Sequence, residues 1–128
     1  MFDRELVITD LRNILWSMKQ IAKRFDTVNS PTEFTNDDAG LVKLDSICLQ
    51  LINIGEVLKH IDKLTEEKLL ANYPGVDWKK AKGMRDVITH HYFDIDAETI
   101  YAVCREHLPP MQKVIAAILE EVENAERK

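Results

Sequence analysis

The sequence predicts an all-α fold, an up-and-down bundle of about five helices, and three observations support this prediction. Only four Gly and four Pro occur in 128 residues. Leu, Ile, Lys, Glu and Ala, most of which favour helices, are abundant. Apolar residues recur at intervals of three and four, the spacing of one helix face. A chain of this length fits one domain, residues 1–128, that buries a core without disulfides or metal.

The first helix is predicted from about Asp3 to Phe25, because this segment carries one apolar stripe at helical spacing. The stretch TVNSPTEFTNDD that follows collects turn-forming and capping residues. Pro31 interrupts any helix there, and Asn36, Asp37 or Asp38 can cap the next one.

The second long helix runs through an apolar band between Leu41 and Ile61. The band is too wide for contact with a single neighbour, which predicts a central helix that is partly buried between subunits. Thr65 can then cap a short helix in EEKLLANY, which Pro74 and Gly75 end.

Two aspartates are expected to start the remaining helices. Asp77 can cap the segment WKKAKGMRDVITHHY, and Asp96 can cap a helix that continues to His107. Pro109 and Pro110 then either kink this helix or begin a last one that ends in the tail EEVENAERK.

The formal net charge of -5 opposes general attraction to nucleic acid. RNA binding would therefore need a local basic patch. Lys79, Lys80, Lys82 and Arg85 form the densest basic cluster, beside Trp78, and could guide RNA phosphates. An ordinary solvated helix face explains the same cluster equally well.

No metal site or cofactor is expected, because Cys48 and Cys104 lack the spacing of metal ligands or of a redox pair and are predicted to be buried thiols. The segment MFDRELVITD has no apolar core of a signal peptide, and no apolar run approaches the roughly 20 residues of a membrane span. These features predict a cytoplasmic protein with no membrane contact.

The segment after Trp78 holds the pattern Arg-x4-His-x-Tyr in Arg85, His90 and Tyr92. With six Arg and four His in the chain, a His five positions after an Arg is expected about 0.2 times by chance, and the added Tyr makes the pattern about fortyfold rarer. The alternative, purely structural interpretation is that Arg85 lies on the surface, His90 is solvated, and Tyr92 is a half-buried aromatic residue.

On an ideal helix, Met84, Val87, Ile88 and His91 share one face and form a predicted core stripe. Arg85 and His90 diverge by about 140° around the axis, so one regular helix cannot easily bring them together. They could meet if the helix unwinds near His90. They could also meet if two copies of the helix face each other, which predicts a dimeric site.

The pattern resembles the signature of the HEPN superfamily, and the following x-Tyr resembles its HepT branch. Other parts of the sequence that are similar to this branch are Glu33 and Phe34, Ile54-Gly55-Glu56, Pro74 with Trp78, and the stretch from Tyr92 to Asp96. The resemblance covers nearly the whole chain.

The resemblance implies a homodimer with the signature at its interface, and the toxin of a type VII HEPN/MNT toxin–antitoxin system. Arg85 and His90 would be catalytic in a metal-independent RNase. The partner would be an MNT-type nucleotidyltransferase antitoxin that neutralises the toxin by adding AMP to Tyr92. The chemistry is sensible, because an imidazole can deprotonate the ribose 2′-OH and a guanidinium can stabilise phosphorane charge.

One residue departs from the resemblance, because the position after the Arg is often Asn in this branch and is Asp86 here. Its carboxylate could repel RNA phosphate, or it could hydrogen-bond His90 and support its basicity. The sequence therefore leaves both effects of Asp86 on the catalytic rate as alternatives. A non-catalytic nucleotide- or substrate-binding subunit of a nucleotidyltransferase is the alternative function, followed by a helical interaction protein with a vestigial motif.

Overall fold

The computed structural model describes residues 2–90 and 96–126, and within these ranges the chain contains helices and helical turns but no strand. The long helices are α1 (Arg4–Phe25), α2 (Asp38–Thr65) and α3 (Trp78–His90). The shorter α4 (Ala97–Ala102) continues through a π-helical turn (Val103–His107) into α5 (Leu108–Glu126). The all-α prediction is confirmed. Four long helices result, because α4 and α5 form one continuous element.

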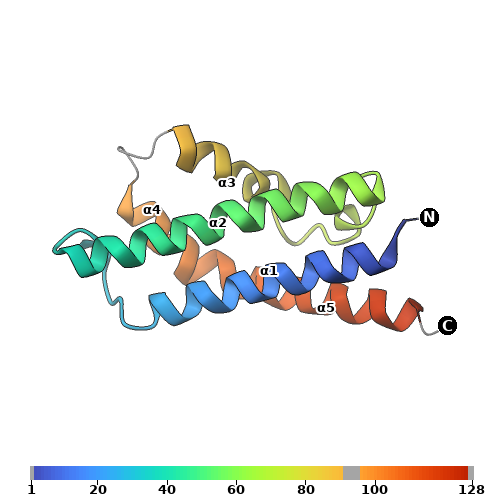
Figure 1. The fold of residues 1–128 in the computed structure, drawn as a ribbon, viewed down its shortest axis with the longest axis horizontal. Helices are drawn as coiled ribbons and strands as arrows, with labels where there is room; N and C mark the ends of the chain where they lie inside the picture. Colours follow the sequence, from blue (N-terminus) through green and yellow to red (C-terminus); the bar gives the residue numbers. More distant parts are fainter. Residues whose placement is uncertain (1, 91–95, 127–128) are drawn as a thin grey trace.

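These helices pack as an elongated bundle (Figure 1). α1 lies antiparallel to α2 and to α5, and α3 packs on α2. The start of α1 and the end of α5 lie at the same end of the bundle, where Arg12 and Glu123 form an ion pair of 2.8 Å. Fully buried side chains fill the space between α1, α2 and α5: Val7, Leu11, Ile14, Phe34, Ile47, Leu58, Ile61, Ile115 and Ile118.

The helix starts are those that the capping residues predict. The Asp37 carboxylate accepts the N–H of Gly40 at 2.8 Å, and the Asp96 carboxylate accepts that of Glu98 at 2.9 Å. Asp3 caps α1 by accepting the N–H of Leu6. Each carboxylate satisfies an N–H group that has no partner within its own helix.

The predicted helix in residues 66–73 is wrong, because only the 3-10 turn η2 (Leu70–Asn72) forms there. Thr65 ends α2 instead of capping a new helix, and its hydroxyl donates to the Ile61 carbonyl at 2.9 Å. Glu66 and Glu67 follow with φ angles of 54° and 62°. This left-handed pair reverses the chain direction and prevents a regular helix from starting at once.

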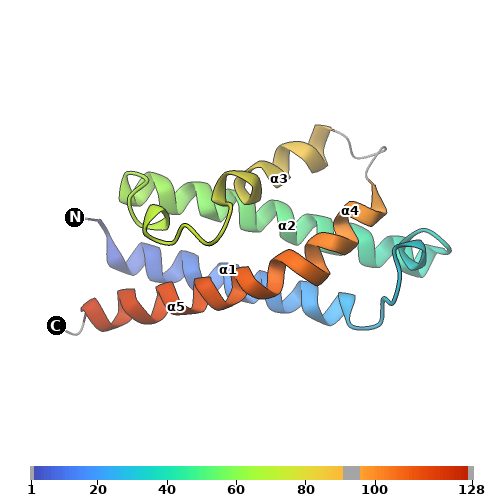
Figure 2. The same cartoon turned by 180° about the vertical axis from the view of Figure 1, so that it is seen from behind.

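Of the two outcomes predicted for the proline pair, a kink or the start of a last helix, the structure has α5 begin at Leu108, directly before the prolines, and its ribbon is continuous with the turn that precedes it (Figure 2). Pro109 and Pro110 stand in the first turn of α5, directly after the π-helical turn. Within that turn the N–H of Leu108 reaches back five residues to the Val103 carbonyl. Proline rings clash with carbonyls four residues earlier in a regular helix. The wider turn provides room for both rings, so the helix continues.

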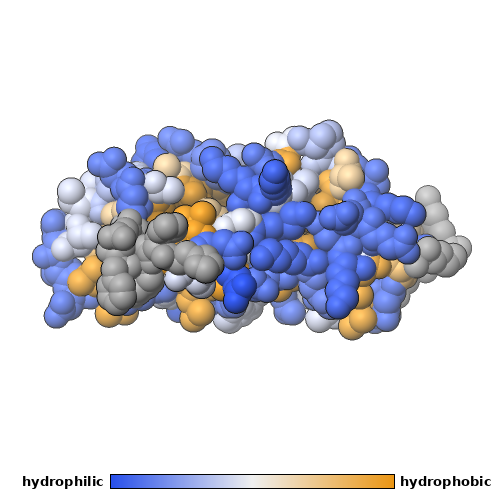
Figure 3. Space-filling model, turned by 90° about the horizontal axis from the view of Figure 1, so that it is seen from above, coloured by the Kyte–Doolittle hydropathy of each residue, from blue (hydrophilic) through white to orange (hydrophobic). Residues whose placement is uncertain are grey.

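Most of the surface in Figure 3 is hydrophilic, with separate apolar areas between the polar ones. None of the helices in residues 2–90 and 96–126 has both the length and the hydropathy that a membrane span requires.

Candidate functional site

α3 carries the first part of the predicted motif, and local contacts fix its start while close packing holds it on α2. Asp77 caps its first turn by accepting the N–H of Lys80 at 3.0 Å. Trp78 is buried, and its ring N–H donates to the Tyr73 carbonyl at 2.9 Å. Gly55 on α2 faces the α3 backbone, where a Cβ would lie 3.3 Å from the Ala81 carbonyl oxygen. The glycine therefore permits a close approach of the two helices.

Arg85 is paired across the helix interface with Glu56. Its Nε lies 3.2 Å from Glu56 Oε1, and the two side chains are 48% and 47% exposed. Lys59 lies 3.6 Å from the same carboxylate oxygen. One carboxylate on α2 is thus shared by two cations at the surface. Because the contact uses Nε, the terminal nitrogens of the guanidinium are the donors that a phosphate could engage.

The remainder of the motif lies partly outside the described residues. α3 ends at His90, whose backbone closes the helix and whose side chain is not among the described groups. His91 and Tyr92 fall in the segment 91–95, outside the described ranges, so their predicted roles stay predictions. Asp86 is exposed. Near the helix end, the Thr89 hydroxyl donates to the Arg85 carbonyl at 2.8 Å.

The basic cluster is divided by the fold. Lys79 and Lys80 are exposed on the first turn of α3. Lys82, by contrast, forms an ion pair with Asp62 of α2, whose side chain is only 11% exposed. Since the Asp62 carboxylate offsets the Lys82 charge, Lys79 and Lys80 are the more available cations for an RNA phosphate.

The predicted core stripe of α3 is partly wrong. Ile88 is buried at 2% exposure and Met84 is half-buried, as the stripe requires. Val87 is 51% exposed, so it does not face the core. Among the described residues, α2 is the element that packs extensively on α3, and the flank that holds Val87 lies outside this contact.

A second feature near Arg85 is a pair of exposed apolar side chains on α2, with the exposed Asp45 between them on the same helix face. Val42 and Leu49 are 66% and 56% exposed. Together with Glu56 they recur every seven residues and therefore share one helix face. This face starts beside the Arg85–Glu56 pair and continues toward the N-terminal end of α2. Leu41 adds another exposed apolar side chain at that end.

No group of three or more His, Cys, Asp or Glu in the described part of the chain is arranged to hold a metal ion. Cys48 and Cys104 are buried free thiols, as predicted. Burial raises the pKa of Cys48 to about 11 and that of Cys104 to about 12. Both thiols therefore stay protonated at neutral pH and are poor nucleophiles.

The role of Glu56 could be predicted only in part from the sequence. A carboxylate within an apolar helix predicts a partner such as Lys, Arg or a backbone donor. The structure supplies both Lys59 and Arg85 and leaves the carboxylate at the surface. The identity of Arg85 as partner depends on how α3 packs, which no local pattern in the sequence encodes.

Comparisons with known proteins identify the family of this chain. A family model described as "Ribonuclease HepT-like" matches residues 14–118. Two proteins of Methanocaldococcus jannaschii, each named a "putative RNase", are similar over 92 residues. One is 34% identical and covers 71% of this chain and 69% of its own length. The other is 35% identical and covers 71% and 72%.

A third protein of that organism, with the same kind of name, is 32% identical over 115 residues, or 88% of this chain and 87% of its own length. No solved structure is significantly similar to the chain.

Proposed function

Because this chain belongs to the HepT-like ribonuclease family, we propose that it cleaves RNA, without a metal ion, through Arg85 and His90. The observation that carries the proposal is the motif itself, set at the end of a helix whose Arg85 guanidinium is half-exposed at the surface. A guanidinium in this position is open to a phosphate, and its charge persists at any physiological pH.

In the proposed reaction, the His90 imidazole removes the proton of a ribose 2′-OH. The 2′-oxygen attacks the adjacent phosphorus, and the bond from phosphorus to the 5′-oxygen breaks as that oxygen takes up a proton. Arg85 stabilises the charge of the phosphorane between these events. The products are a 2′,3′-cyclic phosphate and a 5′-hydroxyl. Lys79 and Lys80 would attract the RNA backbone toward the site.

We also propose that the active form is a homodimer. On an ideal helix, two positions five residues apart, such as 85 and 90, lie about 140° apart around the axis, so a site that uses both residues is most simply built from two copies. The exposed apolar side chains Val42 and Leu49 of α2 support this assembly. Leu49 stands seven residues from Glu56, about 10 Å along the helix axis. A second copy covering Leu49 would therefore approach Arg85 as well.

The proposed setting is a toxin–antitoxin pair, in which an MNT-type nucleotidyltransferase neutralises the chain. The Tyr92 phenol would attack the α-phosphorus of ATP, form a bond to AMP and release pyrophosphate. The added phosphate would place bulk and negative charge two residues from His90 and repel RNA. Mass spectrometry after incubation with such an enzyme and ATP checks this step, with Tyr101 as the internal control. AMP on Tyr101 but not on Tyr92 would contradict it.

The ribonuclease proposal is tested with purified wild type, Arg85→Ala and His90→Ala, assayed on total RNA with EDTA present. Arg105→Ala is the matched control, because Arg105 is an exposed Arg of the π-helical turn outside the motif. We expect His90→Ala to lower the cleavage rate by about 10²–10⁴-fold, and Arg85→Ala by about 10²–10³-fold. Equal activity in all four proteins would contradict the assignment of Arg85 and His90 as catalytic. Loss of wild-type activity in EDTA would contradict metal independence.

The dimer is tested with Leu49→Asp, which places a charge on the exposed face without disturbing the monomer core. Analytical ultracentrifugation should show a monomer, and RNA cleavage should be lost with it. Leu6→Asp is the control, because Leu6 is 46% exposed on α1. A Leu49→Asp protein that stays dimeric would exclude this face as the interface.

A further inference from the structure

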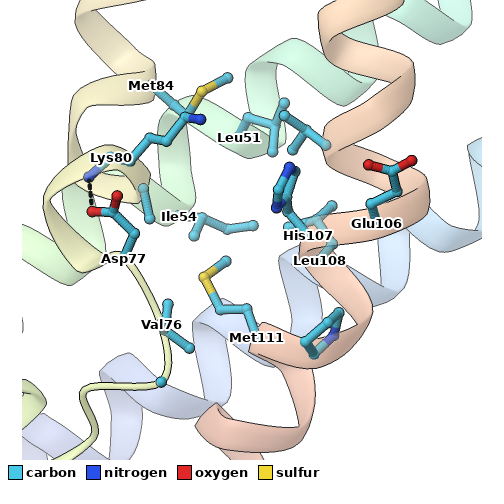
Figure 4. Close-up of a pocket in the computed structure, with 14 residues that line it drawn as sticks. Leu51, Ile54, Val76, Asp77, Lys80, Met84, Glu106, His107, Leu108 and Met111 are labelled. Carbon is cyan, nitrogen blue, oxygen red and sulfur yellow. Dashed lines mark hydrogen bonds between the residues drawn. The ribbon is translucent and has the colours of Figure 1, made fainter.

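A pocket lies between α2, α3 and the joined α4–α5 helix (Figure 4). Its volume is about 270 Å³. Neither Arg85 nor Asp86 lines it. Ala81 and Met84, on a different face of α3 from the Arg85–Glu56 pair, form one wall. Arg85 therefore stands outside the pocket, whereas Lys80, which is proposed above to attract RNA, stands at its rim.

The floor of the pocket is apolar and adaptable. Leu51 and Ile54 come from α2, Met84 from α3, and Leu108 and Met111 from α5. None of these side chains can form the hydrogen bonds that would recognise a polar ring, such as a nucleobase. Two methionines let the floor adjust to the shape of an apolar group. A cavity of about 150 Å³ admits benzene, so this pocket has room for a larger hydrocarbon body.

Four of the described residues at the rim are charged or titratable, and they differ in how free they are to bind a ligand: Asp77, Lys80, Glu106 and His107. The Asp77 carboxylate is already occupied, because it caps α3 through the Lys80 N–H at 3.0 Å. Figure 4 shows the Glu106 carboxylate pointing away from the pocket, whereas the His107 ring faces it. The Lys80 ammonium stands on the opposite wall from His107. Within the described residues, neither Lys80 nor His107 has an ion pair or a side-chain hydrogen bond.

From this arrangement, we propose that the pocket binds a small organic acid with an apolar body, such as a medium-chain or aromatic carboxylate. The hydrocarbon displaces water from the floor, which is favourable by about 25 cal/mol per Å² of apolar surface buried. The carboxylate lies at the rim, where it accepts hydrogen bonds from Lys80 and His107. A polar nucleotide fits less well, because the floor offers its base no hydrogen-bonding group.

One wall of the pocket lies where the π-helical turn meets α5. His107 ends the turn and Leu108 begins α5, and both line the pocket. His107 and Met111 stand four residues apart and therefore share a helix face. This face carries both side chains into the pocket.

The test is ¹³C-methyl methionine NMR of the full chain, titrated with octanoate. Met84 and Met111 line the pocket, and Met18, buried at 3% exposure on α1, is an internal control. We expect saturable shifts at the two pocket methyls and none at Met18. Lys80→Glu should weaken octanoate binding tenfold or more, and His107→Gln several-fold. Lys79→Glu is the matched control, since Lys79 precedes Lys80 but does not line the pocket.

Three results would overturn the proposal. The first is no saturable shift of Met84 or Met111 with octanoate. The second is binding of octylamine or AMP as tightly as octanoate, which would show no preference for an apolar acid. The third is an equal loss of affinity in Lys79→Glu and Lys80→Glu. The readout is binding alone, so it is independent of whether the chain cleaves RNA.

Discussion

Gly40, in the first turn of α2, is the position where a single methyl group should disturb the fold most clearly. A Cβ built there would lie 2.0 Å from the Glu33 carbonyl oxygen and 3.1 Å from the Phe34 carbonyl carbon. Ordinary carbon–oxygen contacts are about 3.3–3.6 Å, so the overlap exceeds 1 Å. The opposing atoms are backbone atoms of η1 (Pro31–Phe34) and cannot rotate away. Gly40→Ala therefore requires that turn to move.

The displaced turn is held firmly on both sides. Phe34 is fully buried, and the Glu33 carboxylate accepts the backbone N–H of Ser30 at 2.8 Å. Overpacking of this kind costs about 1–3 kcal/mol, and Ala recovers at most about 0.5–1 kcal/mol of helix propensity. We expect Gly40→Ala to lower the free energy of unfolding by about 2 kcal/mol, or roughly 6–10 °C in Tm.

The assay is urea and thermal unfolding followed by far-UV circular dichroism. Gly83→Ala is the matched control, because Gly83 lies within α3 and no atom lies within 4 Å of its added Cβ. This control should gain about 0.5–1 kcal/mol. A Gly40→Ala protein as stable as wild type would contradict the close contact between η1 and α2 at this position.

Three further perturbations test the charged and buried groups. Glu56→Gln removes a half-exposed ion pair that water and salt screen, so urea unfolding should show a loss of at most about 1 kcal/mol, smaller still in high salt; a larger loss would contradict this. Asp62→Asn leaves the Lys82 ammonium unpaired in a partly buried place and should cost about 1–3 kcal/mol. A double-mutant cycle with Lys82→Met should recover part of that loss, and simple additivity would show that the pair is not coupled. Burial raises the pKa of Cys48 to about 11 and that of Cys104 to about 12, from 9.0 in an exposed thiol. The unfolded chain therefore releases these protons first, so stability is unaffected below about pH 9 and falls as the pH rises toward 12. Neither thiol should react with iodoacetamide in the native protein at neutral pH, and rapid labelling would refute their burial.

The sequence by itself determined the class of fold and most helix starts. Apolar spacing predicts α1 and α2, and the carboxylates of Asp37, Asp77 and Asp96 mark helix starts that the structure confirms. These features could be predicted because they are local. A cap depends on residues two or three positions apart, and an amphipathic stripe depends on one helix.

The errors arise where neighbouring elements decide the conformation. The segment after Thr65 has helix-forming composition, yet the left-handed Glu66 and Glu67 turn the chain instead. Val87 fits a core spacing, yet it is exposed, because no described element covers its flank of α3. Tertiary packing overrides local preference in both places, because propensity differences between ordinary residues are only a few tenths of a kcal/mol.

The candidate site divides in the same way. The sequence could identify Arg85, His90 and Tyr92 as candidates, because all three lie in one short segment with a recognisable spacing. The sequence could not predict three other features: the Arg85–Glu56 ion pair, the Lys82–Asp62 ion pair, and the pocket between Lys80 and His107. Each depends on which face α3 turns toward α2 or α5. That orientation follows from close packing at Gly55 and burial of Trp78 and Ile88, a property of several helices together that only the tertiary structure decides.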